Sequence, residues 1–347
     1  MSTRRARTAI LTILVFGLVV PGCGSGGGGG PATGPTTVRL GYFPNLTHAT
    51  AIVGVAEGIF QEHLGADRLE VSTFNAGPAV VEALFSEGLD AAYIGPNPAI
   101  NAFAQSDGRA VRIIAGATSG GASLVVGPGI AVAEDLRGQR VASPQLGGTQ
   151  DVALRHWLLD HRLRTDTQGG GEVSILPQEN AQTLDTFRSG EIQAAWVPEP
   201  WATRLVQEAG GTVLVDESTL WPRGRFVTTH LIVRTRFLEE HPDAVRRLLE
   251  GHVQADDLVN RNPAEAQRVV NAGIEAITGK KLPDQVIAAA WKHLAFTVDP
   301  VAASLSTAAA HAAAVGLLDE VDLSGIYAVE LLNEVLRTAG RATVAVS

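Results

Sequence analysis

Short apolar runs alternate with longer amphipathic stretches along the chain from residue 37 onward. Apolar runs such as residues 37–43 and 140–143 are typical of buried strands. Stretches such as residues 78–87 and 149–160 have the apolar spacing of helices, with glycine or proline near their ends. Strands that alternate with helices of about 10–15 residues predict parallel α/β sheets.

This alternation occurs twice, before and after Gly129, so the sequence predicts two α/β lobes. An extended run over residues 226–234 follows the second series and would lead back to the first lobe. Residues 236–338 read as helices only, and among them we expect one helix over residues 283–295. In the first lobe, residues 49–60 read as a single helix.

The N-terminus has the pattern of an export signal. Arg4, Arg5 and Arg7 precede an apolar run from Ala9 to Val20. That run fits the core of a signal peptide and is too short for an ordinary membrane span. Residues 1–22 are therefore predicted to be a signal peptide, which places the mature chain outside the cytoplasm.

Cys23 is the only cysteine, and the residues before it resemble a bacterial lipobox, although Pro21 is unusual in that motif. The resemblance implies cleavage before Cys23 and a lipid on it, with residues 23–36 as a glycine-rich tether. Plain secretion with an unused thiol is the alternative. Removing residues 1–22 changes the net charge from −9 to −12, because three arginines and no acids are lost. An anionic protein is not attracted to an anionic bilayer, so the lipid would supply the attachment to the bacterial cell membrane.

Composition excludes several classes of protein. The acidic balance argues against a nucleic-acid binder. A single cysteine excludes a disulfide framework, and 45% hydrophobic residues with 18% charged residues exclude intrinsic disorder. Nucleotide-binding loops, an H-E-x-x-H or C-x-x-C motif and a G-x-S-x-G elbow are all missing. We therefore expect no catalytic residue, no cofactor and no metal site.

Small polar residues gather in turns that follow predicted strands and precede predicted helices. The four turns are residues 43–48, 75–78, 95–98 and 143–150, and residues 118–121 follow another strand. An open α/β sheet places its ligand crevice at such positions. Helix N-termini there offer free N–H groups and a positive dipole end. The turns predict a cleft for a small ligand between the lobes, and ordinary helix capping is the alternative.

Four further side chains each have two interpretations. Glu199 either accepts a ligand ammonium or a cation, or stabilises a helix start by its charge. Trp201 either walls the pocket or is a core aromatic. Thr228 either donates its hydroxyl to the ligand or reflects β-propensity. His48, the only histidine in a candidate ligand turn, is more readily a structural histidine than a ligand contact.

Several ordered segments resemble the periplasmic solute-binding proteins of ABC importers, in the group that serves alkanesulfonate, taurine and nitrate uptake. The matching segments are Leu40-Gly-Tyr-Phe-Pro-Asn-Leu-Thr-His-Ala, Gly77-Pro-Ala-Val-Val-Glu-Ala-Leu, Gly88-Leu-Asp-Ala-Ala-Tyr-Ile-Gly, Asp135-Leu-Arg-Gly-Gln-Arg-Val-Ala and Val197-Pro-Glu-Pro-Trp-Ala. They occur in the family's order over roughly residues 37–335. The resemblance implies an α/β fold of the type II periplasmic binding protein class.

The resemblance also implies the organisation of the two lobes. Lobe 1 would comprise residues 37–125 and lobe 2 residues 126–228. Residues 229–340 would return to lobe 1 with a strand and the C-terminal helices. The chain would cross between lobes near residues 118–129 and 226–231 and close on its solute by a hinge motion.

The family's binding positions, carried over by motif, predict ten residues around the ligand: Asn45, Thr47, Gly77, Pro96, Asn97, Ser119, Gly148, Thr149, Glu199 and Thr228. The implied partners are a small solute and the permease and ATPase subunits of an importer, with the binding protein itself a monomer.

None of the candidate turns carries lysine or arginine. An anion would therefore be held by backbone N–H groups, hydroxyls and helix dipoles, which suits a sulfonate or another compact oxyanion. Glu199 near the site would suit a zwitterion such as taurine. The alternatives are a sensor or interaction lipoprotein without a transporter, and a thiamine-pyrimidine-precursor binding protein or enzyme. The cysteine-rich motif of the enzymatic members is absent.

Overall fold

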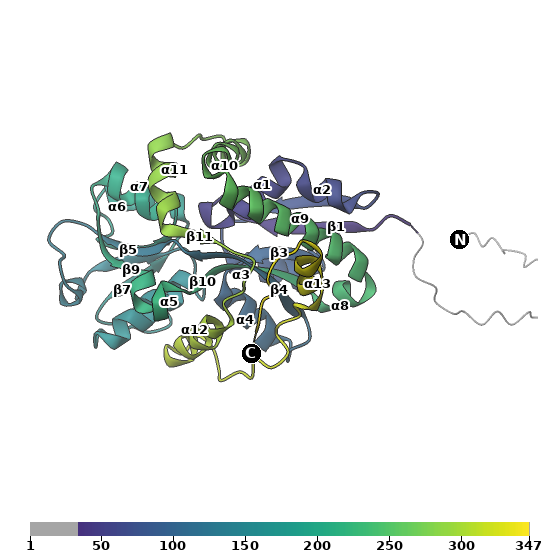
Figure 1. Cartoon of the computed structure of the whole chain (residues 1–347). Helices are drawn as coiled ribbons and strands as arrows, with labels where there is room; N and C mark the ends of the chain where they lie inside the picture. Colours follow the sequence, from purple (N-terminus) through teal and green to yellow (C-terminus); the bar gives the residue numbers. More distant parts are fainter. Residues whose placement is uncertain (1–33, 347) are drawn as a thin grey trace, which may run out of the picture. The chain divides into compact units, whose positions relative to one another are not determined.

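Two β-sheets organise residues 34–346, the part of the chain that this computed structural model describes (Figure 1). The predicted signal peptide, the Cys23 lipidation site and the tether as far as residue 33 lie outside the described residues. Just before the first sheet, the Thr36 N–H donates to Asp67 Oδ1 at 2.9 Å.

The first sheet has six strands in the order β11-β4-β10-β3-β1-β2. Their bounds are β1 (Thr37–Tyr42), β2 (Arg68–Thr73), β3 (Ala91–Ile94), β4 (Val111–Gly120), β10 (Val227–Arg234) and β11 (Leu294–Phe296). Strand β1 pairs in parallel with β2 and β3, whereas β10 runs antiparallel to both β3 and β4. The parallel strands therefore end at one edge of the sheet, where their following turns come together.

The second sheet has five strands in the order β7-β6-β8-β5-β9. Their bounds are β5 (Ala122–Val126), β6 (Arg140–Ser143), β7 (Ser174–Pro177), β8 (Ala194–Pro198) and β9 (Thr212–Asp216). Strand β6 is parallel to β7 and β8, and β5 is antiparallel to β8 and β9. This sheet repeats the pattern of the first, with one antiparallel strand inserted among parallel ones.

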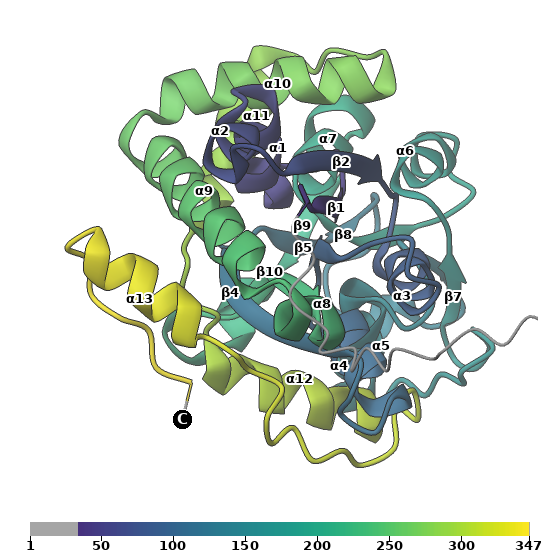
Figure 2. The ribbon, with the colours of Figure 1, turned by 90° about the vertical axis from the view of Figure 1, so that its right-hand side faces the viewer.

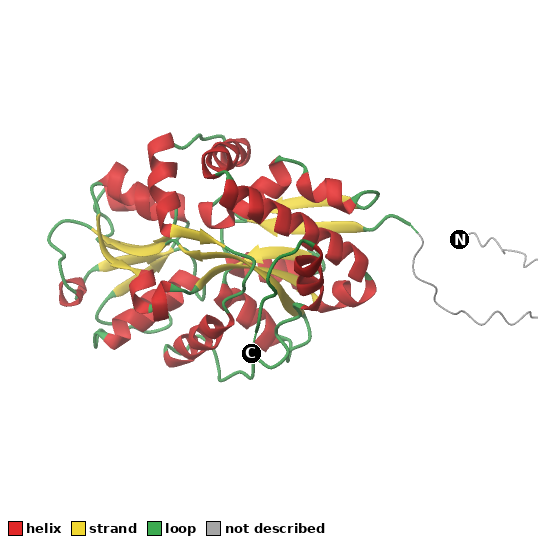
Figure 3. Ribbon diagram, in the orientation of Figure 1, coloured by secondary structure: helices red, strands yellow, loops and turns green. Residues whose placement is uncertain are grey.

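Helices cover both faces of each sheet (Figure 3). The first lobe contains α1 (Ala49–Ala56), α2 (Ile59–Leu64), α3 (Gly77–Phe85) and α4 (Pro96–Gln105), and the second contains α5 (Thr149–Asp160), α6 (Asn180–Arg188) and α7 (Trp201–Ala209). The C-terminal region adds α8 (Thr235–Glu240), α9 (Pro242–Arg261), α10 (Pro263–Thr278), α11 (Asp284–Ala290), α12 (Ala302–Ala314) and α13 (Glu330–Thr338).

Most C-terminal helices pack on the first lobe. Helices α9 and α10 contact α1, α9 also contacts α2, and α13 lies on α9, as Figure 2 shows. Two of the helices also reach the second lobe, because α11 contacts α7 and α12 contacts both α4 and α5. The C-terminal region thus covers lobe 1 and touches lobe 2.

Strand β3 shows why apolar runs in this chain form central strands. All four of its side chains are buried. Ala91 and Tyr93 belong to the core beneath α1 and α9, whereas Ala92 and Ile94 belong to the core beneath α3 and α4. A strand covered by helices on both faces must be apolar at every position, so it cannot alternate with polar residues.

The chain first changes sheets at Gly120 and Gly121, which corrects the predicted boundary at residue 125. Both glycines have positive φ (80° and 76°), a region that residues with a Cβ rarely adopt. They turn the chain between β4 and β5, so β5 pairs in the second sheet. The return crossing runs through residues 217–226, because β10 already pairs with β4 at Val227. The predicted boundary at residue 228 is therefore also too late.

Two predicted helices differ from the structure. The helix expected over residues 49–60 is two helices, broken at Gly58, whose φ is 70°. The helix expected over residues 283–295 ends at Ala290, and Leu294–Phe296 forms β11 against β4. The free edge of β4 offers backbone partners to this segment, which local helix propensity does not reveal.

Candidate functional site

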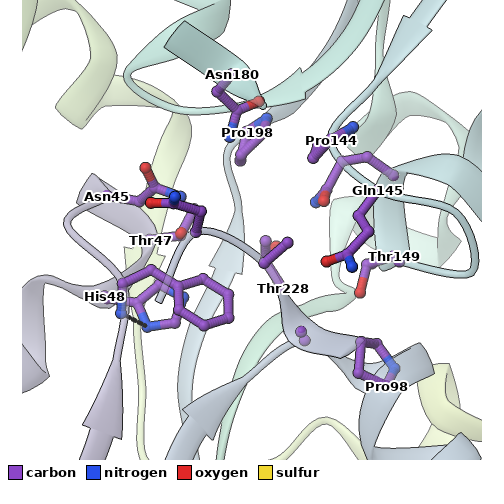
Figure 4. Close-up of a pocket in the computed structure, with 17 residues that line it drawn as sticks. Asn45, Thr47, His48, Pro98, Pro144, Gln145, Thr149, Asn180, Pro198 and Thr228 are labelled. Carbon is purple, nitrogen blue, oxygen red and sulfur yellow. Dashed lines mark hydrogen bonds between the residues drawn. The ribbon is translucent and has the colours of Figure 1, made fainter. Parts of the chain in front are cut away.

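A polar pocket lies between the two lobes. From the first lobe it is lined by the turns that follow β1, β2 and β3, and by Thr228 of β10. From the second lobe it is lined by the turn after β6, by Asn180 after β7 and by Pro198 at the end of β8. In Figure 4, Asn45 and His48 lie on one side of the pocket and Gln145 and Thr149 lie on the other. The strand ends of both sheets thus meet where a ligand crevice is expected.

Six of the ten predicted site residues line this pocket. They are Asn45, Thr47, Gly77, Gly148, Thr149 and Thr228. The structure brings them together from four separate segments of the two lobes. Thr228 also has a role inside the protein, because its hydroxyl donates to the Gly120 carbonyl at the first crossing. Contact of these residues with a ligand stays a prediction.

The other four predicted residues do not line the pocket. Pro96 and Asn97 lie in the first turn of α4, and Asn97 Nδ2 donates to the Ala308 carbonyl of α12 at 3.1 Å. Ser119 pairs with Val227 inside the first sheet. The Asn97 side chain is therefore directed toward α12 and away from the pocket. The backbone of Ser119 is already paired within the sheet.

Glu199 is the fourth residue outside the pocket. Its buried carboxylate accepts from the backbone N–H of Thr203 at 3.1 Å and from the Thr203 hydroxyl at 2.9 Å. Burial raises the pKa of this carboxyl above its usual value. The Glu199 carboxylate therefore accepts hydrogen bonds from the first turn of α7. This arrangement matches the interpretation of Glu199 as a residue that stabilises the start of a helix.

The polar turn residues do not cap the helices that follow them. The N-cap residues of α3, α4, α5 and α6 make no side-chain capping hydrogen bond. Each of these helices is long enough, at nine to twelve residues, to present a positive dipole end. Side-chain capping therefore does not explain Asn75, Asn97 or Thr149, although glycine or proline marks the starts of α3, α4 and α5, as the capping alternative expects.

Two buried polar atoms of the pocket lack a protein partner. Thr149 Oγ1 and Asn180 Oδ1 make no hydrogen bond, and the two residues are only 9% and 8% exposed. A buried polar atom without a partner costs about 1–3 kcal/mol, so such atoms are rare in folded proteins. Both residues line the pocket, where a ligand acceptor can meet the Thr149 hydroxyl and only a ligand donor can meet Asn180 Oδ1.

The pocket carries no charged side chain among its lining residues. Its only titratable group is His48, and burial lowers the pKa of that imidazole to about 3. His48 is therefore neutral near pH 7, where its Nδ1 accepts from the Phe43 N–H at 3.3 Å. The polarity of the pocket comes from backbone N–H groups, hydroxyls and amides. Such a set can bind an oxyanion without a formal positive charge.

Sequence reasoning missed two residues of the second lobe, Gln145 and Asn180. Gln145 lies in a turn that was recognised, but only Gly148 and Thr149 were selected there. Asn180 was not recognised at all. It follows β7 and is the first residue of α6, so the rule that found the other turns applies to it as well.

A second compartment adjoins the pocket and shares Asn45, Asn75 and Asn180 with it. Its outer walls are Trp201 and Arg204 of α7 and the apolar side chains of Ile274 and Leu282. Two side-chain hydrogen bonds join the lobes here. Trp201 Nε1 donates to Asn45 Oδ1 at 3.0 Å, and Asn75 Nδ2 donates to Glu179 Oε1 at 2.9 Å. Trp201 therefore lines the second compartment and not the pocket itself, and its ring also packs against the core of the second lobe.

Residues 34–346 offer neither a metal site built from a cluster of side chains nor a helix that spans a membrane. No group of three or more His, Cys, Asp or Glu residues in this range is arranged to hold a metal ion. Within the same range, every helix is too short or too polar to cross a bilayer.

The chain is similar to known binding proteins in sequence and fold. A model of the NMT1-like family matches residues 31–274. The taurine-binding periplasmic protein of Escherichia coli (strain K12) is 27% identical over 216 residues, which cover 61% of this chain and 64% of that protein.

Two solved structures share the fold. The alkanesulfonate-binding protein SsuA from Xanthomonas axonopodis pv. citri, bound to MOPS, superimposes with a TM-score of 0.69 at 20% identity, covering 83% of this chain and 96% of that one. The periplasmic nitrate-binding protein NrtA from Synechocystis PCC 6803 gives a TM-score of 0.70 at 17% identity, covering 88% and 89%. The predicted two-lobe fold of periplasmic binding proteins is thereby confirmed.

Proposed function

Because this chain belongs to the NMT1-like family, we propose that it is the extracytoplasmic solute-binding protein of an ABC importer. It captures a small sulfonate or a related oxyanion by closure of its two lobes and delivers it to the permease. It returns the solute unchanged and is therefore not an enzyme.

The observation that carries this proposal is the chemistry of the interlobe pocket. Four helices begin at its edge without a side-chain cap, and no charged side chain lines it. The Thr149 hydroxyl, which can donate, is buried there, and within residues 34–346 it has no partner. A compact oxyanion accepts hydrogen bonds from hydroxyls, amides and helix N–H groups at once, so it suits this arrangement.

The similar proteins support the class of ligand. One relative is named for taurine, and structural neighbours are named for alkanesulfonates and nitrate. All three ligands carry a sulfonate or nitrate oxyanion. Taurine also carries an ammonium group. Glu199 does not provide a carboxylate for that group here, because the Glu199 carboxylate accepts two hydrogen bonds from Thr203.

The proposed cellular context follows from the N-terminus. Signal peptidase cleaves before Cys23, the lipid on Cys23 holds the protein at the outer side of the cell membrane, and residues 24–36 form the tether. The partners are the permease and ATPase subunits of the importer, and the binding protein acts as a monomer.

A thermal unfolding panel tests the ligand class. The protein is heated with ethanesulfonate, taurine, nitrate, bicarbonate, sulfate or a thiamine pyrimidine. A ligand that binds only the folded state stabilises it by about 2.7 kcal/mol at a concentration of 100 Kd. We expect the sulfonates to raise the Tm. A shift with the pyrimidine alone, or no shift with any oxyanion, would contradict the proposal.

A further inference from the structure

Trp201 of the second lobe reaches a residue of the ligand pocket in the first lobe. It is the first residue of α7, and its indole Nε1–H donates to Asn45 Oδ1 at 3.0 Å. Asn45 lies in the turn after β1, just before a short 3-10 helix at Leu46–His48. This hydrogen bond therefore joins the two lobes at the wall that the pocket shares with the second compartment.

The contact determines which way the Asn45 amide points. An indole N–H can only donate, so the Asn45 atom that meets it must be the carbonyl oxygen. The amide nitrogen, Nδ2, is then on the other branch of the side chain. Asn45 is 6% exposed and lines the pocket, and among residues 34–346 its Nδ2 donates to no protein acceptor. The side chain does not cap the helix that follows it either.

The orientation of the indole is itself supported within α7. The Arg204 guanidinium lies over the Trp201 ring, 4.7 Å from its centroid. Glu208 holds Arg204 by two hydrogen bonds of 2.9 and 3.0 Å. Arg204 and Glu208 therefore hold the Trp201 indole in place, so that its N–H points toward Asn45. The Asn45 amide in the first lobe accepts this hydrogen bond.

We propose that Trp201 is a positioning residue that acts through Asn45. When the lobes close, the indole N–H binds the Asn45 oxygen and leaves Nδ2 as a donor for the ligand. When the lobes are apart, the amide is free to present either its oxygen or its nitrogen. The Asn45 amide can either donate or accept before closure, and closure leaves only its Nδ2 donor facing the ligand. This favours an anion at this point and disfavours a ligand group that donates. This inference rests on the proposed function and deepens it by naming a residue that sets charge selectivity.

A first experiment tests the contact itself, both without ligand and with saturating ethanesulfonate, because the contact belongs to the closed state. The full chain is labelled with 15N-tryptophan, which gives five indole N–H resonances. The Trp201 resonance is assigned by its loss in Trp201→Phe. In Asn45→Ala we expect this resonance to move and its proton to exchange faster with water. The Trp196 indole, which donates to Glu217 Oε2 at 2.8 Å, is the internal control and stays in place. A Trp201 resonance that Asn45→Ala moves neither in the free protein nor with ethanesulfonate present would overturn the proposal.

A second experiment measures whether Trp201 acts on binding through Asn45. Trp201→Phe keeps an aromatic ring and removes the N–H, and we expect it to weaken ethanesulfonate binding by about tenfold. In the Asn45→Ala background the same substitution should change the affinity by less than about twofold, because the amide is already absent. Trp291→Phe, which makes the same change beside Phe296 and outside the pocket, serves as the matched control and leaves the affinity unchanged.

The outcomes separate this inference from the proposed function. An equal loss of affinity from Trp201→Phe in both backgrounds would show that Trp201 acts only by shape and would overturn the inference. Failure of the unmodified chain to bind ethanesulfonate would contradict the proposed function, whereas the indole experiment would still decide whether Trp201 orients Asn45.

Discussion

Thr149 and Asn180 are the residues at which the structure points most directly to a ligand. Both are buried at the start of a helix, and both keep a side-chain oxygen without a protein partner. In most folded proteins such atoms are satisfied by protein groups or by ordered water. Here the two atoms come from different segments of the second lobe and line one pocket. The Thr149 hydroxyl can donate to a bound anion, whereas Asn180 Oδ1 can only accept and needs a donor on the ligand.

Replacing Thr149 with valine separates binding from stability. The Thr149 hydroxyl bonds no protein group, so we expect Thr149→Val to leave the Tm nearly unchanged. Its loss should weaken sulfonate binding by about tenfold, since a hydrogen bond to a charged group contributes about 1.5–3 kcal/mol. Isothermal titration calorimetry and thermal unfolding measure the two effects.

Thr203→Val is the matched control for that substitution. It removes a hydroxyl that donates to Glu199 Oε1, so it should lower the Tm and leave the affinity unchanged. If Thr149→Val behaved like this control, Thr149 would have a structural role and no role in binding.

Glu217 gives the protein a predictable dependence of stability on pH. Its carboxylate is buried in the segment that returns to the first lobe and accepts from Trp196 Nε1 at 2.8 Å. Burial raises the pKa of Glu217 from 4.5 to about 7. The folded state therefore holds a proton that the unfolded state has already lost between these pH values. The contribution of Glu217 to stability is largest below pH 4.5 and falls as the pH rises to 7.

Glu217→Gln should remove this dependence, because glutamine stays neutral and still offers a carbonyl to Trp196. Relative to the variant, the unmodified protein should lose about 3 kcal/mol of unfolding free energy between pH 4.5 and pH 8. Urea unfolding of both proteins across this range measures the difference. Parallel pH curves would show that Glu217 does not titrate in this window.

At the scale of elements, the site depends on how closely helix starts approach one another. Helices α3 and α4 meet where Gly77 faces Pro98, and both residues line the pocket. A Cβ on Gly77 would lie 2.3 and 2.7 Å from two side-chain atoms of Pro98. Glycine at position 77 is therefore needed for the contact between the two helices, in addition to its place beside the ligand.

Gly77→Ala should force α3 and α4 apart at their N-termini. Overpacking of this kind costs about 1–3 kcal/mol, so we expect a lower Tm together with weaker sulfonate binding. Gly88→Ala is the control just beyond the same helix, because its added Cβ would meet the Ala83 carbonyl at an ordinary 3.4 Å. Equal Tm values for the two variants would contradict the close approach at Gly77.

At the scale of the molecule, two crossings connect the lobes and polar side chains bridge the cleft. Gly120 and Gly121 turn the chain from β4 into β5, and residues 217–226 bring it back. Across the opening, Asn75 Nδ2 donates to Glu179 Oε1, and both residues are exposed. The described conformation is therefore one in which side chains of the two lobes touch beside the pocket.

A thiol cross-link between these positions should report closure. The chain has no cysteine beyond Cys23, so Asn75→Cys and Glu179→Cys can be combined with Cys23→Ser to give one reactive pair. We expect a short bifunctional maleimide to link the pair faster when ethanesulfonate is bound, and the linked protein to release its ligand more slowly. The two single-cysteine variants are the controls. Equal cross-linking rates with and without ethanesulfonate would contradict hinge closure.

The sequence by itself determined the two α/β series, the positions of most helices and six of the residues that line the pocket. Helix starts and buried strands have local patterns, because apolar period, proline and glycine act over a few residues. Turns that follow parallel strands converge wherever the strands lie in one sheet, so Asn45 and Gly77, which follow β1 and β2, were predictable as parts of one site. Asn180 carried the same local pattern and was overlooked.

Only the tertiary structure decided the features that depend on distant partners. The apolar sequence of strand β5 is compatible with a central position in either sheet. The turn at Gly120 and Gly121 directs β5 into the second sheet. Strand β11 exists because β4 has a free edge. Asn97 faces α12 and Trp201 faces Asn45 because helix packing fixes the direction of each side chain, and residues far apart in sequence supply the contacts. No local pattern records such contacts, since a side chain's partner is set by how whole elements pack together.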